Sequence, residues 1–253
     1  MSGWFELEQE FERWDDPSRP ASMWWRDDDA CRESPLLDRA LALSETYGVP
    51  LGLAVIPAVV TPAFSLSLSL LKPDIEVLQH GFAHRNHAGK NKKKSEFGDG
   101  RAMEVMIDEI SRGTGILRAA ASNRFVPMFV PPWNRVARPL IAALPGLGFH
   151  SLSTFGARSS AEPAPGLRQV NTHVDLIDWR GSRRCRGSGL LLAELVAHLE
   201  ARRSGTDDEP TGILSHHLAH DEDCWKFLDT LFSLTSKQGN VCWLSPSEAV
   251  GLA

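Results

Sequence analysis

Short apolar segments alternate with helix signals along this chain, and this alternation constrains its fold more than any other feature. We predict strands at residues 21–25, 51–56, 75–79, 125–130, 149–152, 212–215 and 241–244, with helices at 35–47, 62–71, 103–120, 139–144, 190–203 and 225–234. Two helices begin with a capping residue and a proline, Ser34-Pro35 and Thr61-Pro62. Strands that alternate with helices form parallel α/β sheets. The sequence therefore predicts a βα barrel or a doubly wound sheet.

The length of 253 residues suits one α/β barrel domain, and we predict a single domain over residues 1–253. Residues 3–14 carry Trp4, Leu7, Phe11 and Trp14 at helical spacing among glutamates. This pattern predicts an amphipathic helix that packs on the barrel, within residues 1–20. The polar stretches at residues 85–101 and 154–188 lack periodicity and are predicted to be long loops.

Charge and composition exclude several classes of function. The net charge of -5 makes a nucleic-acid backbone an unsuitable partner. The most apolar run, which begins at Leu51, is too short to span a bilayer, and the first residues resemble no export signal. The cysteines lie far apart, at Cys31, Cys185, Cys224 and Cys242, which predicts free thiols. We therefore expect a cytoplasmic protein that binds neither nucleic acid nor membrane.

Polar clusters follow several predicted strands at their carboxyl ends. They are Asp27-Asp28-Asp29, His80 with His84, Pro131-Pro132-Trp133-Asn134, and Ser215-His216-His217. Active sites of parallel α/β folds are built at that end of the strands. We therefore expect these clusters to meet in one site.

Two histidines four residues apart and a carboxylate from another strand form a typical site for a divalent ion. His80 and His84 have this spacing, and so do His216 and His220, so either pair can instead be structural. Neighbouring carboxylates repel each other, which raises a pKa and suits a general base. The aspartates also have a structural interpretation, in which Asp29 caps the helix that begins near Pro35.

With these motifs the sequence resembles the polysaccharide deacetylase superfamily of NodB-homology carbohydrate esterases, and within it a polysaccharide deacetylase-like bacterial subgroup. Those enzymes carry an Asp-Asp pair, a catalytic base followed by a metal ligand, and then H-[ST]-x-x-H. The resemblance implies that Asp28 is the base and that Asp29, His80 and His84 bind the metal. The triple aspartate also allows the register Asp27-Asp28.

The remaining motifs of the family match with one exception. The third, R-x-P-[YFW], corresponds to Val130-Pro131-Pro132-Trp133 and lacks the arginine, with Asn134 and Arg135 as nearby polar candidates. The fourth, D-x-x-D-W, matches Asp175-Leu-Ile-Asp178-Trp179. The fifth, L-x-H, matches Leu214-Ser215-His216 and implies that His216 is the general acid, with His217 as the alternative. Asp178 joins the predicted catalytic set, and the predicted substrate-binding residues are Pro132, Trp133, Asn134, Arg135 and Trp179.

The resemblance implies a distorted (β/α)₇ barrel that removes an acetyl group from an N-acetylated amino sugar or a related acetamide. It implies one divalent ion, with zinc as the first expectation and cobalt, nickel, iron or manganese as alternatives. Two other functions stay open: a metal-dependent amidase for a small cytosolic substrate, and a noncatalytic carbohydrate-binding relic of the fold, which the missing arginine would favour. Arginines near the predicted site, at 135, 180, 183, 184 and 186, favour a soluble substrate that carries a negative group. The oligomeric state is not indicated.

Overall fold

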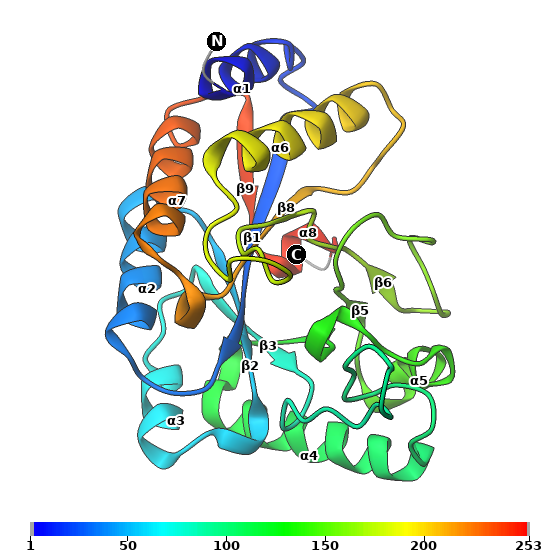
Figure 1. The fold of residues 1–253 in the computed structure, drawn as a ribbon. Helices are drawn as coiled ribbons and strands as arrows, with labels where there is room; N and C mark the ends of the chain where they lie inside the picture. Colours follow the sequence, from blue (N-terminus) through cyan, green and yellow to red (C-terminus); the bar gives the residue numbers. More distant parts are fainter. Residues whose placement is uncertain (1–2, 252–253) are drawn as a thin grey trace.

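The computed structural model describes residues 3–251 and contains one curled parallel sheet (Figure 1). Its strands follow the order β6-β5-β4-β3-β2-β1-β8-β7, with β9 paired to β1. They are β1 (Ala21–Ala30), β2 (Leu51–Val55), β3 (Ile75–His80), β4 (Phe125–Val130), β5 (Ser151–Leu152), β6 (Arg168–Gln169), β7 (Val174–Asp175), β8 (Thr211–Ser215) and β9 (Val241–Leu244). Within the described residues the outer strands β6 and β7 do not pair, so the barrel is open there. This confirms the predicted distorted (β/α)₇ barrel.

All helices except the last one cover the outside of the sheet. The helices are α1 (Gly3–Glu12), α2 (Pro35–Tyr47), α3 (Pro62–Ser69), α4 (Met103–Ala121), α5 (Arg138–Ala143), α6 (Ser188–Arg203), α7 (Glu222–Thr235) and the short α8 (Pro246–Ala249). Ser34 caps α2 by accepting a hydrogen bond from the Leu37 amide, and Thr61 caps α3 in the same way. Both predicted caps are confirmed. The alternative that Asp29 caps α2 is wrong, because Ser34 already fills that position.

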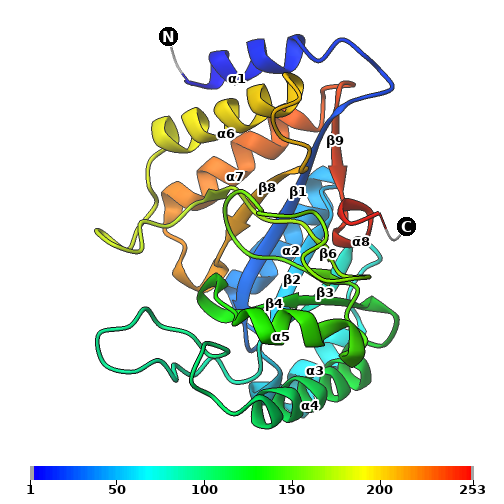
Figure 2. The same cartoon turned by 90° about the vertical axis from the view of Figure 1, so that its right-hand side faces the viewer.

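Of the three apolar clusters in the described residues, two hold helices to the outside of the sheet, and the third, around Trp24 and Met128, packs α8 against its inner face. In the larger one, Leu7 and Phe11 of α1 are fully buried, and Trp4 packs its ring 5.4 Å from that of Phe227. Figure 2 shows α1 lying over α6 at one end of the molecule and α3 with α4 at the other. The second cluster, around Phe97 and Phe129, lies near α4 and α5. No helix in residues 3–251 is both long and apolar enough to cross a membrane.

Two sequence predictions about strands need correction. β1 does not end at Trp25 but continues through the three aspartates to Ala30, because these carboxylates find buried partners described below. Residues 154–188 are not a continuous loop, since β6 and β7 lie within them. These strands have two residues each, too few for alternation to be visible in the sequence.

Candidate active site

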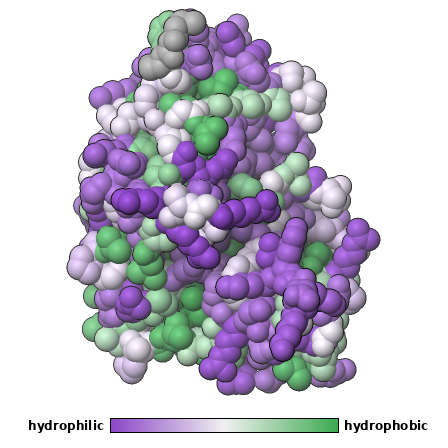
Figure 3. All heavy atoms as spheres, viewed as in Figure 1, coloured by the Kyte–Doolittle hydropathy of each residue, from purple (hydrophilic) through white to green (hydrophobic). Residues whose placement is uncertain are grey.

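An open cleft of about 970 Å³ lies at the carboxyl ends of the central strands. Its walls come from segments that are far apart in the sequence. The residues that line the cleft are Asp28, Asp29, His80, His84, Lys94, Trp133, Asn134, Arg135, Phe155, Asp175, Ile177, Asp178, Trp179, Arg180, Arg183, Arg186 and His216. Hydrophilic side chains gather over the middle of this face in Figure 3, where Figure 1 places the segment that precedes α6. The predicted convergence of the strand-end clusters is therefore observed.

Three of these side chains form a group suited to a metal ion. The Asp29 Oδ1 atom lies 3.0 Å from the His80 Nε2 atom and 3.1 Å from the His84 Nε2 atom. The His80 Nδ1 atom lies 3.1 Å from the Val130 carbonyl oxygen. That carbonyl can only accept, so Nδ1 carries a proton, and Nε2, which faces Asp29, is the nitrogen whose lone pair would bind an ion once its own proton is lost. One carboxylate oxygen and two imidazole Nε2 atoms that converge in this way fit a divalent ion.

Backbone conformation brings Asp29 to the cleft. Side chains alternate along a strand, so Asp29 would normally point away from the face that carries Asp28. The register between β1 and β2 shifts between Asp27 and Ala30, and Asp29 has a φ of 71°. A bulge of this kind redirects a side chain. His84 also has a positive φ, 53°, so two members of the group sit in strained backbone, which is typical of functional sites.

Electrostatics keep the Asp29 carboxyl ionised. Burial alone would raise the pKa of the Asp29 carboxyl, but the hydrogen bonds from His80 and His84 outweigh burial and hold this pKa well below its usual range. Asp29 is therefore ionised at neutral pH, as a metal ligand must be.

Asp28 is held by an arginine from its own strand. The Arg26 Nε and Nη2 atoms donate to the two carboxylate oxygens of Asp28 at 2.9 and 3.1 Å, and both side chains are buried. The same guanidinium donates to Ser153 Oγ at 2.6 Å and to Asn134 Oδ1 at 2.8 Å. A planar guanidinium that makes two parallel bonds fixes the orientation of the carboxylate. Arg26 thus supplies from β1 the arginine that is missing from the third motif, a role that our sequence analysis missed.

Asp27 points away from the cleft. Its carboxylate accepts hydrogen bonds from Ser215 Oγ at 2.6 Å and from the His217 amide at 2.9 Å, and its other oxygen lies 2.5 Å from His217 Nδ1. Asp27 and His217 are fully buried, and neither lines the cleft. The geometry therefore favours the register Asp28-Asp29 over Asp27-Asp28. It also favours His216 over His217 as the general acid.

His216 lies in the cleft wall beside Trp179, with ring centroids 4.7 Å apart. The Trp179 Nε1 atom donates to Asp175 Oδ2 at 2.8 Å, which ties this wall to the end of β7. Burial raises the pKa of Asp175, and the imidazole of His216 partly opposes that shift. Asp175, the first aspartate of the fourth motif, is a candidate site residue absent from our predicted catalytic set.

The other predicted residues divide into two groups. Trp133, Asn134 and Arg135 line the cleft, and the Trp133 ring lies 4.3 Å from that of His84. Pro132 is buried and does not line the cleft. Asp178 lines the cleft, but its carboxylate accepts from the amides of Gly181 and Ser182 at 3.0 and 2.9 Å, so it shapes a turn.

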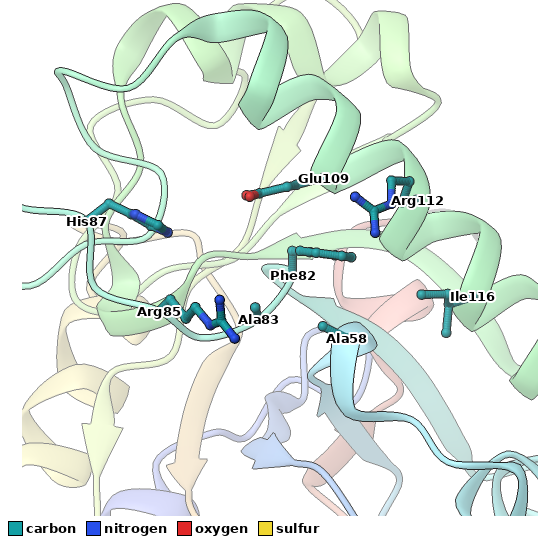
Figure 4. Close-up of a pocket in the computed structure, with 8 residues that line it drawn as sticks. All are labelled: Ala58, Phe82, Ala83, Arg85, His87, Glu109, Arg112 and Ile116. Carbon is teal, nitrogen blue, oxygen red and sulfur yellow. The ribbon is translucent and has the colours of Figure 1, made fainter.

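A smaller pocket of about 290 Å³ lies between the segment after β3 and helix α4 (Figure 4). Arg112 lies over the Phe82 ring there, while Arg85 and His87 approach from the loop. This pocket shares no lining residue with the larger cleft. It also contains no second histidine, so we place the candidate chemistry in the larger cleft.

A second group of potential ligands comprises Cys185, Asp221 and Cys224. Asp221 is the N-cap of α7 and accepts from the amides of Cys224 and Cys185 and from Arg184 Nε. Because these hydrogen bonds already occupy the Asp221 carboxylate, we assign this group of residues a structural role.

Comparison with known proteins supports the fold. No family model and no curated protein sequence matches this chain. Among solved structures, a protein assigned as a polysaccharide deacetylase from Mycobacterium smegmatis matches with a TM-score of 0.64 and 15% identity, over 94% of this chain and 91% of that one. A family 4 acetyl xylan esterase from Clostridium thermocellum, in complex with a cobalt ion, matches with a TM-score of 0.56 and 16% identity, over 91% of both chains.

A pseudoenzyme of the same esterase family from Bacillus anthracis also matches, with a TM-score of 0.54 and 16% identity, over 94% of this chain and 67% of that one. The fold is therefore shared by catalysts and by at least one noncatalytic relative. This chain has the fold of the family 4 carbohydrate esterases and polysaccharide deacetylases.

Proposed function

We propose that this protein is a metal-dependent deacetylase acting on an N-acetylated amino sugar or a related acetamide. One observation carries the proposal: a group suited to a metal, Asp29-His80-His84, lies in the same cleft as an oriented carboxylate, Asp28, and an imidazole, His216. Metal-assisted hydrolysis of an amide uses these three functions together.

Each residue has a defined part in the reaction. Asp29, His80 and His84 hold the ion, and a bound divalent ion supplies Lewis-acid polarisation of the amide carbonyl. Asp28, oriented by Arg26, takes the proton of the attacking water. His216 donates a proton to the leaving amine nitrogen, and the indoles of Trp133 and Trp179 flank the reacting groups. Zinc suits this donor set best, with cobalt, nickel, iron and manganese as alternatives.

The noncatalytic alternative loses its main support. It rested on the missing arginine of the third motif, whereas Arg26 makes the two-pronged contact with Asp28. An unused carboxylate and arginine would be costly to bury, and replacement by apolar side chains is often neutral or stabilising. The amidase alternative uses the same residues and differs only in the size of the substrate.

The four cysteines are free thiols, and a cytoplasmic location stays a prediction.

The test is acetate release by protein stripped with a chelator and then given Zn²⁺, Co²⁺ or Mn²⁺. The substrates are N-acetylglucosamine, its oligomers, small acetamides and acetylated xylan. We expect no activity in the stripped protein and recovery with an added ion. A rate that rises with oligomer length indicates a polymer substrate, while a preference for small acetamides indicates the amidase. Failure of every ion-loaded preparation to release acetate from any of the N-acetylated substrates contradicts the proposal, even if acetylated xylan, an ester, is hydrolysed.

A further inference from the structure

The arginines that follow Trp179 are not equivalent in the fold. Arg184 donates to Asp221 Oδ2 at 3.2 Å, and Arg186 makes two bonds to Glu194 at 2.7 and 2.5 Å. Within residues 3–251, neither Arg180 nor Arg183 forms an ion pair, and both line the cleft. The sequence predicts that all of these arginines flank the substrate. Among the residues that the structure describes, only the guanidinium groups of Arg180 and Arg183 both line the cleft and lack a carboxylate partner, so only these two are candidates to bind it.

The turn that carries these two arginines is built into the structure. Asp178 accepts hydrogen bonds from the Gly181 and Ser182 amides, and the backbone of Asp178 bonds to that of Arg183 and Arg184 at 3.0 and 2.9 Å. A Cβ atom at Gly181 would lie 2.3 Å from the Asp178 carboxylate, so any other residue there would displace this carboxylate. The charge of Asp178 is satisfied by amides rather than by the arginines. The turn therefore presents Arg180 and Arg183 to the cleft without neutralising them.

The turn is also anchored at both ends. Trp179 bonds to Asp175 at the end of β7, and Arg184 with the Cys185 amide bonds to Asp221 at the start of α7. A preformed turn loses little entropy when a ligand binds. Two further cations, Lys94 and Arg135, reach the cleft from other segments. Neither forms an ion pair within the described chain, although Arg135 donates to the Lys94 carbonyl oxygen.

We infer that the turn formed by residues 178–184 is an anion-binding arm, and that the substrate carries a phosphate or carboxylate group beside its acetamide. This inference rests on the proposed deacetylase function and specifies its substrate class. Guanidinium groups bind such anions through paired, charge-assisted hydrogen bonds. A neutral acetamide would leave Arg180 and Arg183 without a partner in the cleft.

The experiment compares N-acetylglucosamine with N-acetylglucosamine 1-phosphate and with an N-acetylated disaccharide that carries a uronate, all with Zn²⁺-loaded protein. We expect the wild type to have a higher kcat/KM for an anionic sugar than for the neutral one. The anionic sugar with the largest increase shows whether the arm binds a phosphate or a carboxylate group. The double variant Arg180→Ala/Arg183→Ala should lower the ratio of anionic to neutral kcat/KM by roughly 10- to 100-fold or more. The matched control, Arg112→Ala/Arg118→Ala, removes two exposed arginines of α4 that do not line the cleft, and should leave this ratio unchanged.

Calorimetric binding of the same sugars gives a readout that needs no turnover. Binding that is selective for an anionic sugar, lost in the double variant of the turn and retained in Arg112→Ala/Arg118→Ala, supports the arm even if no acetate is released. The absence of acetate release would then contradict only the proposed function. Equal kcat/KM for neutral and anionic sugars in the wild type, or an unchanged ratio in the double variant, overturns the inference while leaving deacetylation intact.

Discussion

The chain carries two histidine pairs with the same spacing of four residues, and the fold treats them differently. In the pair His80 and His84, both Nε2 atoms approach one oxygen of Asp29. In the pair His216 and His220, only His216 lines the cleft. The His220 Nε2 atom accepts a hydrogen bond from the His216 amide at 3.3 Å, and its ring packs against Trp225.

The difference arises in the backbone between the two members of each pair. His84 adopts a left-handed conformation that returns its side chain toward Asp29. The segment after His216 is instead a 3₁₀ turn, His217–Ala219, which carries His220 back toward the backbone of its own partner. Equal spacing therefore gives a pair suited to a metal in one place and a structural support in the other, because spacing does not specify the intervening dihedral angles.

The largest expected effect separates the two pairs by their metal content. His80→Ala or His84→Ala removes a ligand, so the purified protein should hold little metal, and kcat/KM should fall by about 10³-fold or more, because the ion supplies several kcal/mol of transition-state stabilisation. Elemental analysis and acetate release measure both quantities.

His220→Ala is the matched control, because it removes a histidine with the same spacing. It should keep its metal, and it should lose about 1–3 kcal/mol of unfolding free energy because the buried His216 amide loses its acceptor. Equal loss of metal in His220→Ala and His80→Ala would show that the two pairs are not distinct.

Within the second pair, His216 and its neighbour His217 can also be separated. His216→Ala should lower kcat by roughly 10²–10⁴-fold with unchanged metal content, because the leaving amine loses its proton donor. His217→Ala should act on stability, since it leaves the buried Asp27 carboxylate without its closest partner, at a cost of about 3–5 kcal/mol. Full activity in His216→Ala together with a loss of kcat in His217→Ala would transfer the role of acid to His217.

A smaller effect is expected at Arg26. Arg26→Lys keeps the charge but cannot make two parallel bonds to Asp28, so kcat should fall by about 10²-fold while KM and metal content change little. Arg202→Lys is the control, because Arg202 is also a buried arginine that bonds to β1, at Ser22, away from the cleft. It should affect thermal stability and not kcat. Equal kcat values for Arg26→Lys and the wild type would remove Arg26 from the mechanism.

The sequence predicts the parallel fold and the composition of the cleft because both depend on local signals. The caps at Ser34 and Thr61 and the apolar runs mark the central strands and helices. Strand ends are equally visible, so the positions of Asp28, Asp29, His80, His84 and His216 at one edge follow from the topology of a parallel sheet.

What the sequence does not predict depends on contacts between distant residues. Arg26 replaces an arginine expected near Val130, and nothing in the string Arg-Asp-Asp-Asp indicates that its first member folds back on its third. Four charged residues directly after an apolar strand are typical of a turn in solvent. In the structure the strand continues through them, because Asp27 pairs with His217, 190 residues away. The bulge at Asp29 is likewise invisible, because it depends on pairing with β2. An arginine two residues before an aspartate on the same strand face is the signal to seek in related chains.

The smallest effect concerns the pH dependence of stability and tests whether His220 is structural. Burial lowers the pKa of His220 from 6.5 to about 4, reinforced by His216 and His217 and opposed by Asp27 and Asp221. The folded pKa lies below the unfolded value, so the unfolded chain binds more protons between pH 6.5 and pH 4, and stability falls as the pH is lowered through this window. Between pH 6.5 and pH 5 the expected loss is at most about 2 kcal/mol.

His220→Gln isolates this contribution, because glutamine can still accept from the His216 amide but does not titrate. Urea unfolding at several pH values should show a shallower loss of stability below pH 6.5 in the variant than in the wild type. Part of the slope will remain, since burial also lowers the pKa of His198, to about 3, with the neighbouring His173 adding to the shift. Parallel curves for the two proteins would mean that His220 is not held neutral by burial. The contrast between the two histidine pairs would then rest on geometry alone.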